Sequence, residues 1–252
     1  KSLGGIEVLQ SKVMPKGLEY DRRWMLIDER DHFMTQRHVP KMAMFRSQWD
    51  AVQQGFVVQH GAEKVWLREG VAGDVVRAVV WKDVVNVLEV DAALSEWFSE
   101  KLGRRCRLVF FPEDAKRDVD ADFAVHPHDQ TSLSDGYPVL MVGQASLDDL
   151  NSRLDEPVGI ERFRPNIVFA GALPFEEDGW KKINVGPVEM AVVKPCSRCV
   201  MTTIDPATGI AGKEPLATLS RYRQVGNKVM FGQNVIPMVP GTIAVGDVII
   251  PR

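Results

Sequence analysis

Residues 181–204 read KKINVGPVEMAVVKPCSRCVMTTI, and this stretch decides the fold class of the chain. It contains three short segments rich in branched and apolar residues, at residues 181–185, 188–194 and 199–204. Runs of this length and composition are typical of β-strands, because a helix needs about ten or more residues with 3.6-residue periodicity. The stretch therefore predicts a β-rich structure. It also contains two of the three cysteines, Cys196 and Cys199.

Strand-like segments also dominate the rest of the chain. Residues 75–81 and 84–90 predict a hairpin, and residues 21–24 are expected to lie in the middle of a strand. One helix is expected over residues 91–102, with Asp at its start and Gly after its end, and a second is expected to open at Ser146. Many short strands with few helices predict a mainly β fold of the α+β class, built as a barrel or sandwich with helical additions.

The overall composition excludes several classes of protein. The chain has 252 residues, of which 45% are hydrophobic and 26% charged, as in an ordinary globular domain. Three cysteines are too few for a disulfide scaffold. No apolar run approaches the length of about 20 residues that spans a bilayer, and we expect no signal peptide before the first residues. We therefore expect a cytoplasmic protein without a membrane span.

The charge is unevenly distributed along the chain. The formal net charge is −3, which argues against a nucleic-acid binder. Residues 1–180 carry 22 Lys and Arg against 30 Asp and Glu, whereas residues 181–252 carry 9 against 4. A basic C-terminal quarter on an acidic protein suggests a local anionic ligand, although chance surface composition also accounts for it.

The two cysteines at C-x-x-C spacing allow several interpretations. Zinc would need a second pair of ligands, and neither Cys106 nor the five histidines repeats a metal-ligand spacing. A thioredoxin-like dithiol should lie between a strand and a helix, but residues 200–204 are expected to continue as a strand. A single thiolate ligand for a transition metal carried by an organic cofactor is a third possibility. Two small core cysteines are the fourth.

Two further clusters could bind a polar ligand. Arg164 and Asn166 come at the start of a predicted strand, and Arg suits bidentate recognition of phosphate. Gly232 precedes Gln233 and Asn234, which allows a close backbone approach to a planar polar ring. A surface salt bridge and an ordinary turn are the alternative interpretations of these two clusters.

Taken together, these motifs resemble the MOSC superfamily, in the branch that has an N-terminal MOSC-associated domain and includes the amidoxime-reducing components. The similarity extends over essentially the whole chain, in order. It rests on residues 1–5 (KSLGG), 20–25 (YDRRWM), 134–138 (SDGYP), 163–167 (FRPNI), 194–199 (KPCSRC), 202–206 (TTIDP), 214–216 (EPL), 222–223 (YR), 231–234 (FGQN) and 246–247 (GD).

The resemblance implies a molybdenum cofactor, in which a molybdopterin holds the metal, with Cys199 as the protein's metal ligand and catalytic residue. The resemblance also implies pyridoxal phosphate binding. The resemblance places the following residues around the cofactor: Lys1, Ser2, Arg22, Gly136, Tyr137, Arg164, Asn166, Ser197, Arg198, Tyr222, Gln233 and Asn234.

The resemblance also implies an activity and a domain organisation. A MOSC-associated β-rich domain is expected over residues 1–100 and a MOSC β-barrel over residues 104–252. The implied activity is reduction of small N-hydroxylated compounds (amidoximes, hydroxylamines and N-hydroxylated bases). With three cysteines the chain cannot form a plant-type [2Fe–2S] site, so a separate ferredoxin, flavin reductase or cytochrome would donate the electrons. The alternative is a sulfur carrier that forms a persulfide on Cys199 for assembly of a metal–sulfur cofactor.

Overall fold

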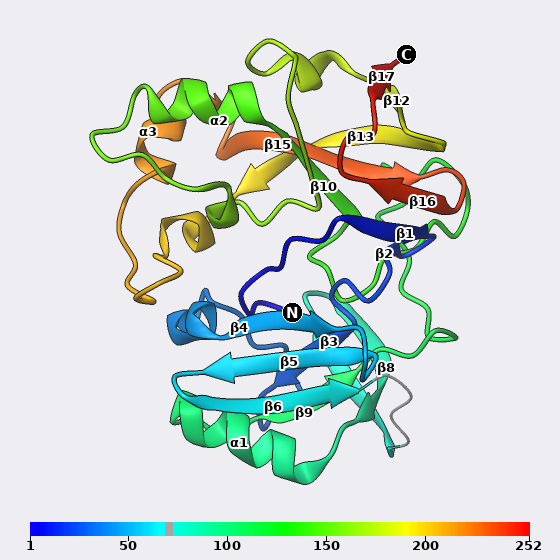
Figure 1. Ribbon diagram of the computed structural model, residues 1–252, viewed down its shortest axis with the longest axis vertical. Helices are drawn as coiled ribbons and strands as arrows, with labels where there is room; N and C mark the ends of the chain where they lie inside the picture. The colour runs from blue at the N-terminus through cyan, green and yellow to red at the C-terminus, as the bar shows by residue number, and fades with distance from the viewer. Residues whose placement is uncertain (69–72) are drawn as a thin grey trace.

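The computed structural model describes residues 1–68 and 73–252. Within this part of the chain the strands form four sheets, and three α-helices pack against them (Figure 1). The predicted mainly β fold with a few helices is therefore confirmed. None of the described helices has the length and apolar character needed to cross a membrane.

The N-terminal part of the chain contains two antiparallel sheets and one helix. The expected hairpin near residues 75–90 is confirmed, as are the limits of the helix. Asp91 Oδ1 accepts a hydrogen bond from the Ala93 amide at 2.6 Å, and Gly103 ends the helix with a φ of 63°. In spatial order, the strands of the first sheet are β3 (Trp24–Ile27), β9 (Arg107–Phe110), β8 (Asp83–Glu89) and β7 (Val75–Val80). Those of the second sheet are β4 (Arg46–Asp50), β5 (Gly55–His60) and β6 (Glu63–Arg68). The helix is α1 (Ala92–Leu102).

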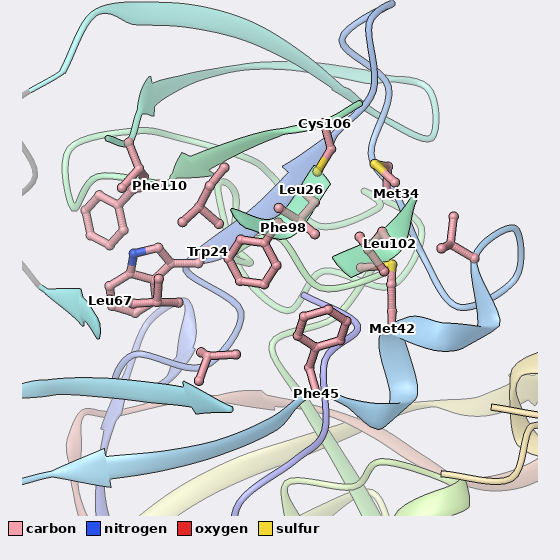
Figure 2. Close-up of a cluster of buried hydrophobic side chains, with 14 residues drawn as sticks. Trp24, Leu26, Met34, Met42, Phe45, Leu67, Phe98, Leu102, Cys106 and Phe110 are labelled. Carbon is pink, nitrogen blue, oxygen red and sulfur yellow. The ribbon is translucent and has the colours of Figure 1, made fainter. Parts of the chain in front are cut away.

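A buried aromatic and aliphatic cluster holds these two sheets to α1. Phe45 and Phe98 are fully buried, with their ring centroids 5.5 Å apart, and Trp24 packs against Phe110 at 4.9 Å (Figure 2). Such large side chains each contribute roughly 2–3 kcal/mol when buried. This cluster fixes β3, and with it the turn that precedes β3 and faces the site.

The C-terminal part is built on a larger sheet. Its longest strands pair antiparallel and bring distant parts of the chain together. In spatial order the strands are β11 (Ile167–Phe169), β10 (Val139–Gly143), β15 (Lys228–Pro237), β13 (Val188–Arg198), β12 (Lys182–Val185) and β17 (Ile249–Pro251), with β14 (Gln224–Val225) paired to β15. The helices of this part are α2 (Gln144–Asn151) and α3 (Leu216–Ser220), and its 3-10 turns are η2 (Ile160–Arg162), η3 (Glu176–Gly179) and η4 (Val200–Thr203).

A small fourth sheet connects the beginning and the end of the chain. In it β16 (Gly241–Ala244) pairs with β1 (Gln10–Met14), which pairs with β2 (Gly17–Leu18). Gly17 has a φ of 114°, and a Cβ there would lie 2.5 Å from the Pro138 carbonyl oxygen. Only glycine allows this approach. The first strands therefore lie beside the C-terminal sheet (Figure 1).

Three local predictions were wrong. Residues 199–204 were expected as a strand, but the chain turns into η4 after β13 ends at Arg198. Residues 21–24 were expected in mid-strand, but Arg22 has a φ of 52° and lies in the turn before β3. The second helix begins at Gln144, two residues before Ser146. There the Ser146 hydroxyl donates to the buried Glu177 carboxylate instead of capping the helix.

Candidate functional site

A cavity of about 1490 Å³ lies where the N-terminal and C-terminal sheets meet. This volume exceeds the roughly 300–1000 Å³ of an ordinary small-molecule site, so there is room for two ligands together. The lining comes from the end of β13, the β7–β8 turn, residues 116–123, residues 134–137 and residues 162–166. The site therefore depends on several segments that lie far apart in the sequence.

Cys199 lies at the exit of β13, as the residue that caps η4, and it is half-buried at the cavity wall. The pairing of β13 with β15 shifts register twice, between Val192 and Lys194 and again between Pro195 and Ser197. Such bulges bend a strand and redirect its side chains, and they are common next to active sites. The irregular end of β13 thereby exposes the C-x-x-C segment to the cavity.

The structure narrows the four interpretations of the cysteines. Cys196 and Cys199 are both half-buried at the cavity, so they are not core thiols, whereas burial raises the pKa of Cys106. The described residues contain no group of three or more His, Cys, Asp or Glu side chains arranged to bind a metal, which disfavours zinc. Because β13 pairs antiparallel with both of its neighbours, a strand-to-helix dithiol is also disfavoured.

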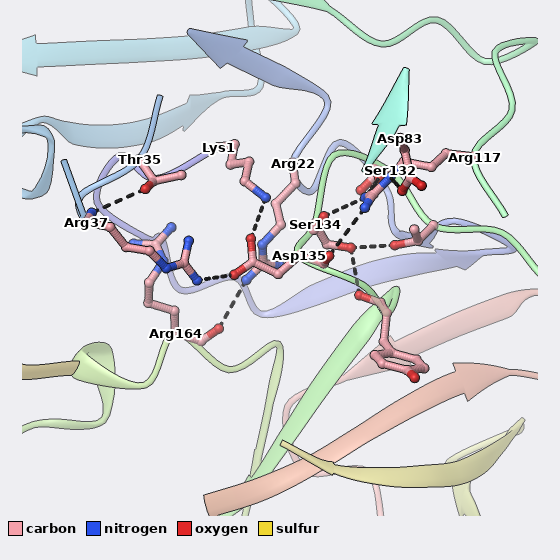
Figure 3. A network of polar contacts seen from close by, with 12 residues as sticks. Lys1, Arg22, Thr35, Arg37, Asp83, Arg117, Ser132, Ser134, Asp135 and Arg164 are labelled. Carbon is pink, nitrogen blue, oxygen red and sulfur yellow. Dashed lines mark hydrogen bonds and ion pairs between the residues drawn. The ribbon is translucent and has the colours of Figure 1, made fainter. Parts of the chain in front are cut away.

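An ion-pair cluster forms one side of the cavity (Figure 3). Asp135 Oδ1 lies 2.6 Å from Lys1 Nζ, and Asp135 Oδ2 lies 2.6 Å from Arg37 Nη2. Burial alone would raise the pKa of Asp135, but the two cations outweigh burial and hold it well below its usual range. Burial likewise opposes the charge of Arg37, yet Asp135 and the Cys199 thiol raise the pKa of Arg37. The charge of Arg37 is therefore coupled to both Asp135 and Cys199.

A second cluster holds two arginines close together. Arg22 donates to Asp21 and to Asn166 Oδ1 at 3.3 Å. It also donates to the Arg164 carbonyl oxygen at 3.2 Å (Figure 3). Asn166 Nδ2 in turn donates to Asp21 Oδ2 at 2.9 Å, and Arg164 Nη1 donates to the Leu3 carbonyl oxygen at 2.7 Å. Burial, followed by the nearby Arg22, lowers the pKa of Arg164 to about 10. Two cations held this close together favour an anionic ligand.

Four residues of the cavity lining have a strained backbone conformation. Ser2, Arg22, Trp81 and Arg164 line the cavity and have φ values of 69°, 52°, 58° and 57°. Residues other than glycine adopt this left-handed region at a cost of roughly 1–3 kcal/mol. Such conformations persist where the surrounding structure holds them, and they are characteristic of ligand sites.

Three buried polar atoms of the cavity lining have no hydrogen-bond partner within the described part of the chain. They are Arg37 Nη1, Arg198 Nε and Tyr137 Oη. Burial, with Asp120 and Asp122, raises the pKa of Tyr137 to about 12, so its hydroxyl keeps a proton to donate. Because an unpaired buried donor costs about 1–3 kcal/mol, these atoms are suited to a polar ligand in the cavity.

The structure brings together most of the residues predicted for the site. Eleven of them line this one cavity: Lys1, Ser2, Arg22, Gly136, Tyr137, Arg164, Asn166, Ser197, Arg198, Cys199 and Asn234.

Tyr222 and Gln233 lie outside the cavity lining. Gln233 is 2% exposed, and its Nε2 donates to Asp178 Oδ1 at 2.7 Å. Successive residues of a strand face opposite sides, so Asn234 faces the cavity while Gln233 does not. Tyr222 packs beneath the Arg153 guanidinium, 4.3 Å from its ring centroid. A role for these two residues in binding the ligand stays a prediction.

Sequence reasoning missed Arg37, Arg117 and Asp135. Asp135 lies within the motif at residues 134–138, but the motif does not reveal its partners. Arg117 is 6% exposed and donates to Asp83 Oδ2 at 2.9 Å and to the Ser134 carbonyl oxygen at 2.6 Å. Arg37 and Arg117 lie in irregular segments without a periodic signal, so only the folded chain reveals their place.

Comparison with known protein families agrees with this architecture. The MOSC N-terminal beta barrel domain matches residues 1–105, and the MOSC domain matches residues 128–250. The chain belongs to the MOSC family, in the branch with the N-terminal β-barrel domain.

The similar proteins in this branch include enzymes named for amidoxime reduction. The chain is 33% identical to mitochondrial amidoxime-reducing component 1 of Homo sapiens, with 98% of this chain and 78% of that protein covered. The corresponding protein of Mus musculus is 32% identical with the same coverage. A molybdenum cofactor sulfurase of Oryza sativa is 30% identical over 92% of this chain but only 31% of its own length.

Proposed function

We propose that this protein is a molybdenum-cofactor oxidoreductase that reduces N-hydroxylated compounds such as amidoximes, hydroxylamines and N-hydroxylated bases. The observation that carries this proposal is a cationic cavity with the Cys199 thiol at its wall, beside Arg37. The kinship with amidoxime-reducing components supports the activity.

The residues of the cavity suit a metal that is carried by an organic cofactor. One cysteine cannot hold a free metal ion, and the described residues offer no cluster of three ligands. Thiolate sulfur is a soft ligand of the kind that transition metals accept. We assign Cys199 as the residue that would bind a metal carried by the pterin.

The cationic groups fit the anionic part of the same cofactor. Lys1, Arg22 and Arg164 line the cavity, and burial lowers the pKa of Lys1 to about 8. A phosphate between them would stabilise their charged forms and relieve the repulsion between Arg22 and Arg164. We therefore assign Lys1, Ser2, Arg22, Arg164 and Asn166 to the phosphate and the pterin.

The remaining predicted residues would orient the ring system. Arg198 Nε and Tyr137 Oη are buried donors without partners, and hydrogen bonds to a polar ring would satisfy both. Gly136, Ser197 and Asn234 complete this wall of the cavity.

When bound, the molybdenum cofactor supplies two-electron reduction with oxygen transfer. The chain contributes ligation through Cys199, and Asp135 keeps Arg37 beside that thiol. Electrons would come from a separate ferredoxin, flavin reductase or cytochrome. A cytoplasmic location and pyridoxal phosphate binding stay predictions. Two of the relatives are named as mitochondrial.

Metal and pterin analysis of protein from a molybdenum-replete host tests the proposal. We expect about one molybdenum and one pterin per chain, and reduction of benzamidoxime by the dye-reduced protein. Purified protein that contains zinc and no molybdenum would contradict the proposal.

A sulfur carrier is the second candidate, because the chain also resembles a molybdenum cofactor sulfurase. In that role the Cys199 thiol would carry a persulfide. Labile sulfane sulfur on Cys199 without bound pterin would favour the carrier, and stoichiometric pterin without sulfane sulfur would favour the reductase.

A further inference from the structure

Lys194 has an unusual environment among the cations of the cavity. Its ammonium lies 3.6 Å from the ring centroid of Phe123 and 5.6 Å from that of Tyr137. The two rings meet edge to face, with centroids 6.3 Å apart. The register shift of β13 between Val192 and Lys194 turns this side chain toward the cavity, which it lines together with both rings.

No carboxylate of the described residues pairs with Lys194. The other half-buried or buried cations of the lining are already engaged by acceptors: Lys1 and Arg37 by Asp135, for example, and Arg117 by Asp83. Within the described part of the chain the Lys194 ammonium has only aromatic faces beside it, which attract a cation but accept no strong hydrogen bond. Its three N–H donors are therefore available to an anionic group in the cavity.

The cavity as a whole reinforces this preference. Eleven Lys and Arg side chains line it against four Asp, and eight of these cations are half-buried or buried. Two of these aspartates, Asp83 and Asp135, are paired with cations, and the other two, Asp118 and Asp120, are exposed on the loop over residues 116–123. Water screens exposed charges far more than half-buried ones, so the positive charge dominates inside the cavity.

We propose that Lys194, seated against Phe123 and Tyr137, selects N-hydroxylated substrates that carry an anionic group such as a carboxylate, and disfavours cationic ones. This inference rests on the proposed reductase function and names the substrate class within it. The aromatic rings hold the ammonium in the cavity and offer an apolar surface to the body of the substrate.

Three matched substrates test the proposal on the molybdenum-loaded protein: 4-carboxybenzamidoxime, benzamidoxime and 4-(trimethylammonio)benzamidoxime. We expect the carboxylate to have the lowest KM and the trimethylammonio compound the highest. Lys194→Met should raise the KM for the carboxylate about tenfold, the effect of a lost charge-assisted hydrogen bond. The KM for benzamidoxime and all three kcat values should change little. Lys194→Arg should keep the preference, and Lys64→Met, an exposed lysine on β6, should change none of these values.

A binding measurement separates this inference from the proposed function. Calorimetry with 4-carboxybenzamide and benzamide, which carry no N–OH group, reports charge preference without turnover. If no amidoxime is reduced but 4-carboxybenzamide binds more tightly and loses this advantage in Lys194→Met, the charge selection holds and the reductase activity fails. Equal KM changes for all three substrates, no binding preference for 4-carboxybenzamide, or loss of molybdenum from Lys194→Met would overturn the role of Lys194.

Discussion

Asp135 Oδ1 and Lys1 Nζ lie 2.6 Å apart, although 134 positions separate the two residues in the sequence. The other carboxylate oxygen of Asp135 holds Arg37 at the same distance. The Lys1 side chain is 4% exposed and that of Arg37 is 15% exposed. One carboxylate therefore neutralises two cations that would otherwise repel each other at the wall of the cavity.

Replacing Asp135 should destabilise the protein. In Asp135→Asn the two cations lose their counter-charge, while the shape of the side chain is kept. Breaking a fully buried pair costs about 3–5 kcal/mol, but the Asp135 side chain is 49% exposed, so we expect about 1–2 kcal/mol. Urea unfolding at pH 7 measures this difference. Asp118→Asn, an exposed control, should change stability by about 0.5 kcal/mol or less, and equal losses in both variants would contradict the prediction.

Asp135→Asn should also change how the free energy of unfolding decreases at acid pH. Because the pKa of Asp135 is depressed in the folded state, the unfolded chain takes up its proton first as the pH falls. The stabilisation is therefore complete above the ordinary carboxyl pKa of about 4 and is lost below it. Asp135→Asn should lose less stability than the parent protein between pH 5 and pH 3 (about the range of this titration).

Because of Lys1, anion binding to the cavity should weaken as the pH rises above neutral. Burial lowers the pKa of Lys1 from 10.5 to about 8, although Asp135 opposes the shift. Below this pH the ammonium attracts an anion, and above it that attraction is lost. Sulfate, whose charge is constant in this range, should bind the cofactor-free protein about five- to tenfold more weakly at pH 9 than at pH 7.

Variants of Lys1 and Lys64 test whether Lys1 causes this pH dependence of sulfate binding. Lys1→Met should weaken sulfate binding at pH 7 and abolish most of the difference between the two pH values, as measured by calorimetry. Lys64→Met should behave like the parent protein because Lys64 is exposed and lies outside the cavity lining. An unchanged pH dependence in Lys1→Met would assign the step to another group.

The sequence predicted the elements that follow from local rules. The helix over residues 91–102 was predicted because Asp91 and Gly103 carry strong capping signals, and the hairpin of β7 and β8 because its branched residues flank a short polar turn. The segment after Cys199 was mispredicted because its composition, VMTT, suits a strand. Bulges in β13 and the turn into η4 override that preference, and their cause is tertiary.

The candidate site was predicted only in part, because local motifs identify some of its residues but not their tertiary contacts. Motifs identified residues such as Arg164, Asn166 and Cys199, which line the cavity. The pairing of Arg37 with Asp135 required the loops of both sheets to be placed side by side. The placement of Gln233 away from the cavity required the register of β15, which no local motif specifies.

Arg117 should be essential for the loop that carries Asp135. Its side chain is 4% exposed, and its guanidinium donates to Asp83 and to the carbonyl oxygens of Ser132 and Ser134. Arg117→Ala would leave these acceptors unpaired, and we expect a loss of about 3–5 kcal/mol in urea unfolding. Arg117→Lys should recover part of the loss, because lysine keeps the charge but not the planar fork. Arg105→Ala, at an 86% exposed side chain, should have little effect. A loss below 1 kcal/mol in Arg117→Ala (about the level of a surface ion pair) would contradict the prediction.

The two cysteines at the cavity should differ in function. Cys199 lies at the end of β13 beside Arg37, and Cys199→Ala should remove both bound molybdenum and benzamidoxime reduction. The Cys196 thiol is instead engaged by Arg198, whose Nη1 lies 3.0 Å from its sulfur. Because a serine hydroxyl can accept the same hydrogen bond, Cys196→Ser should keep most of the metal and the activity. Metal analysis and single-turnover reduction of each variant make the comparison, with Cys106→Ser as a control for loss of a thiol remote from the cavity. Equal loss of metal in Cys196→Ser and Cys199→Ala would show that both sulfurs are needed and would favour a dithiol over a single thiolate ligand.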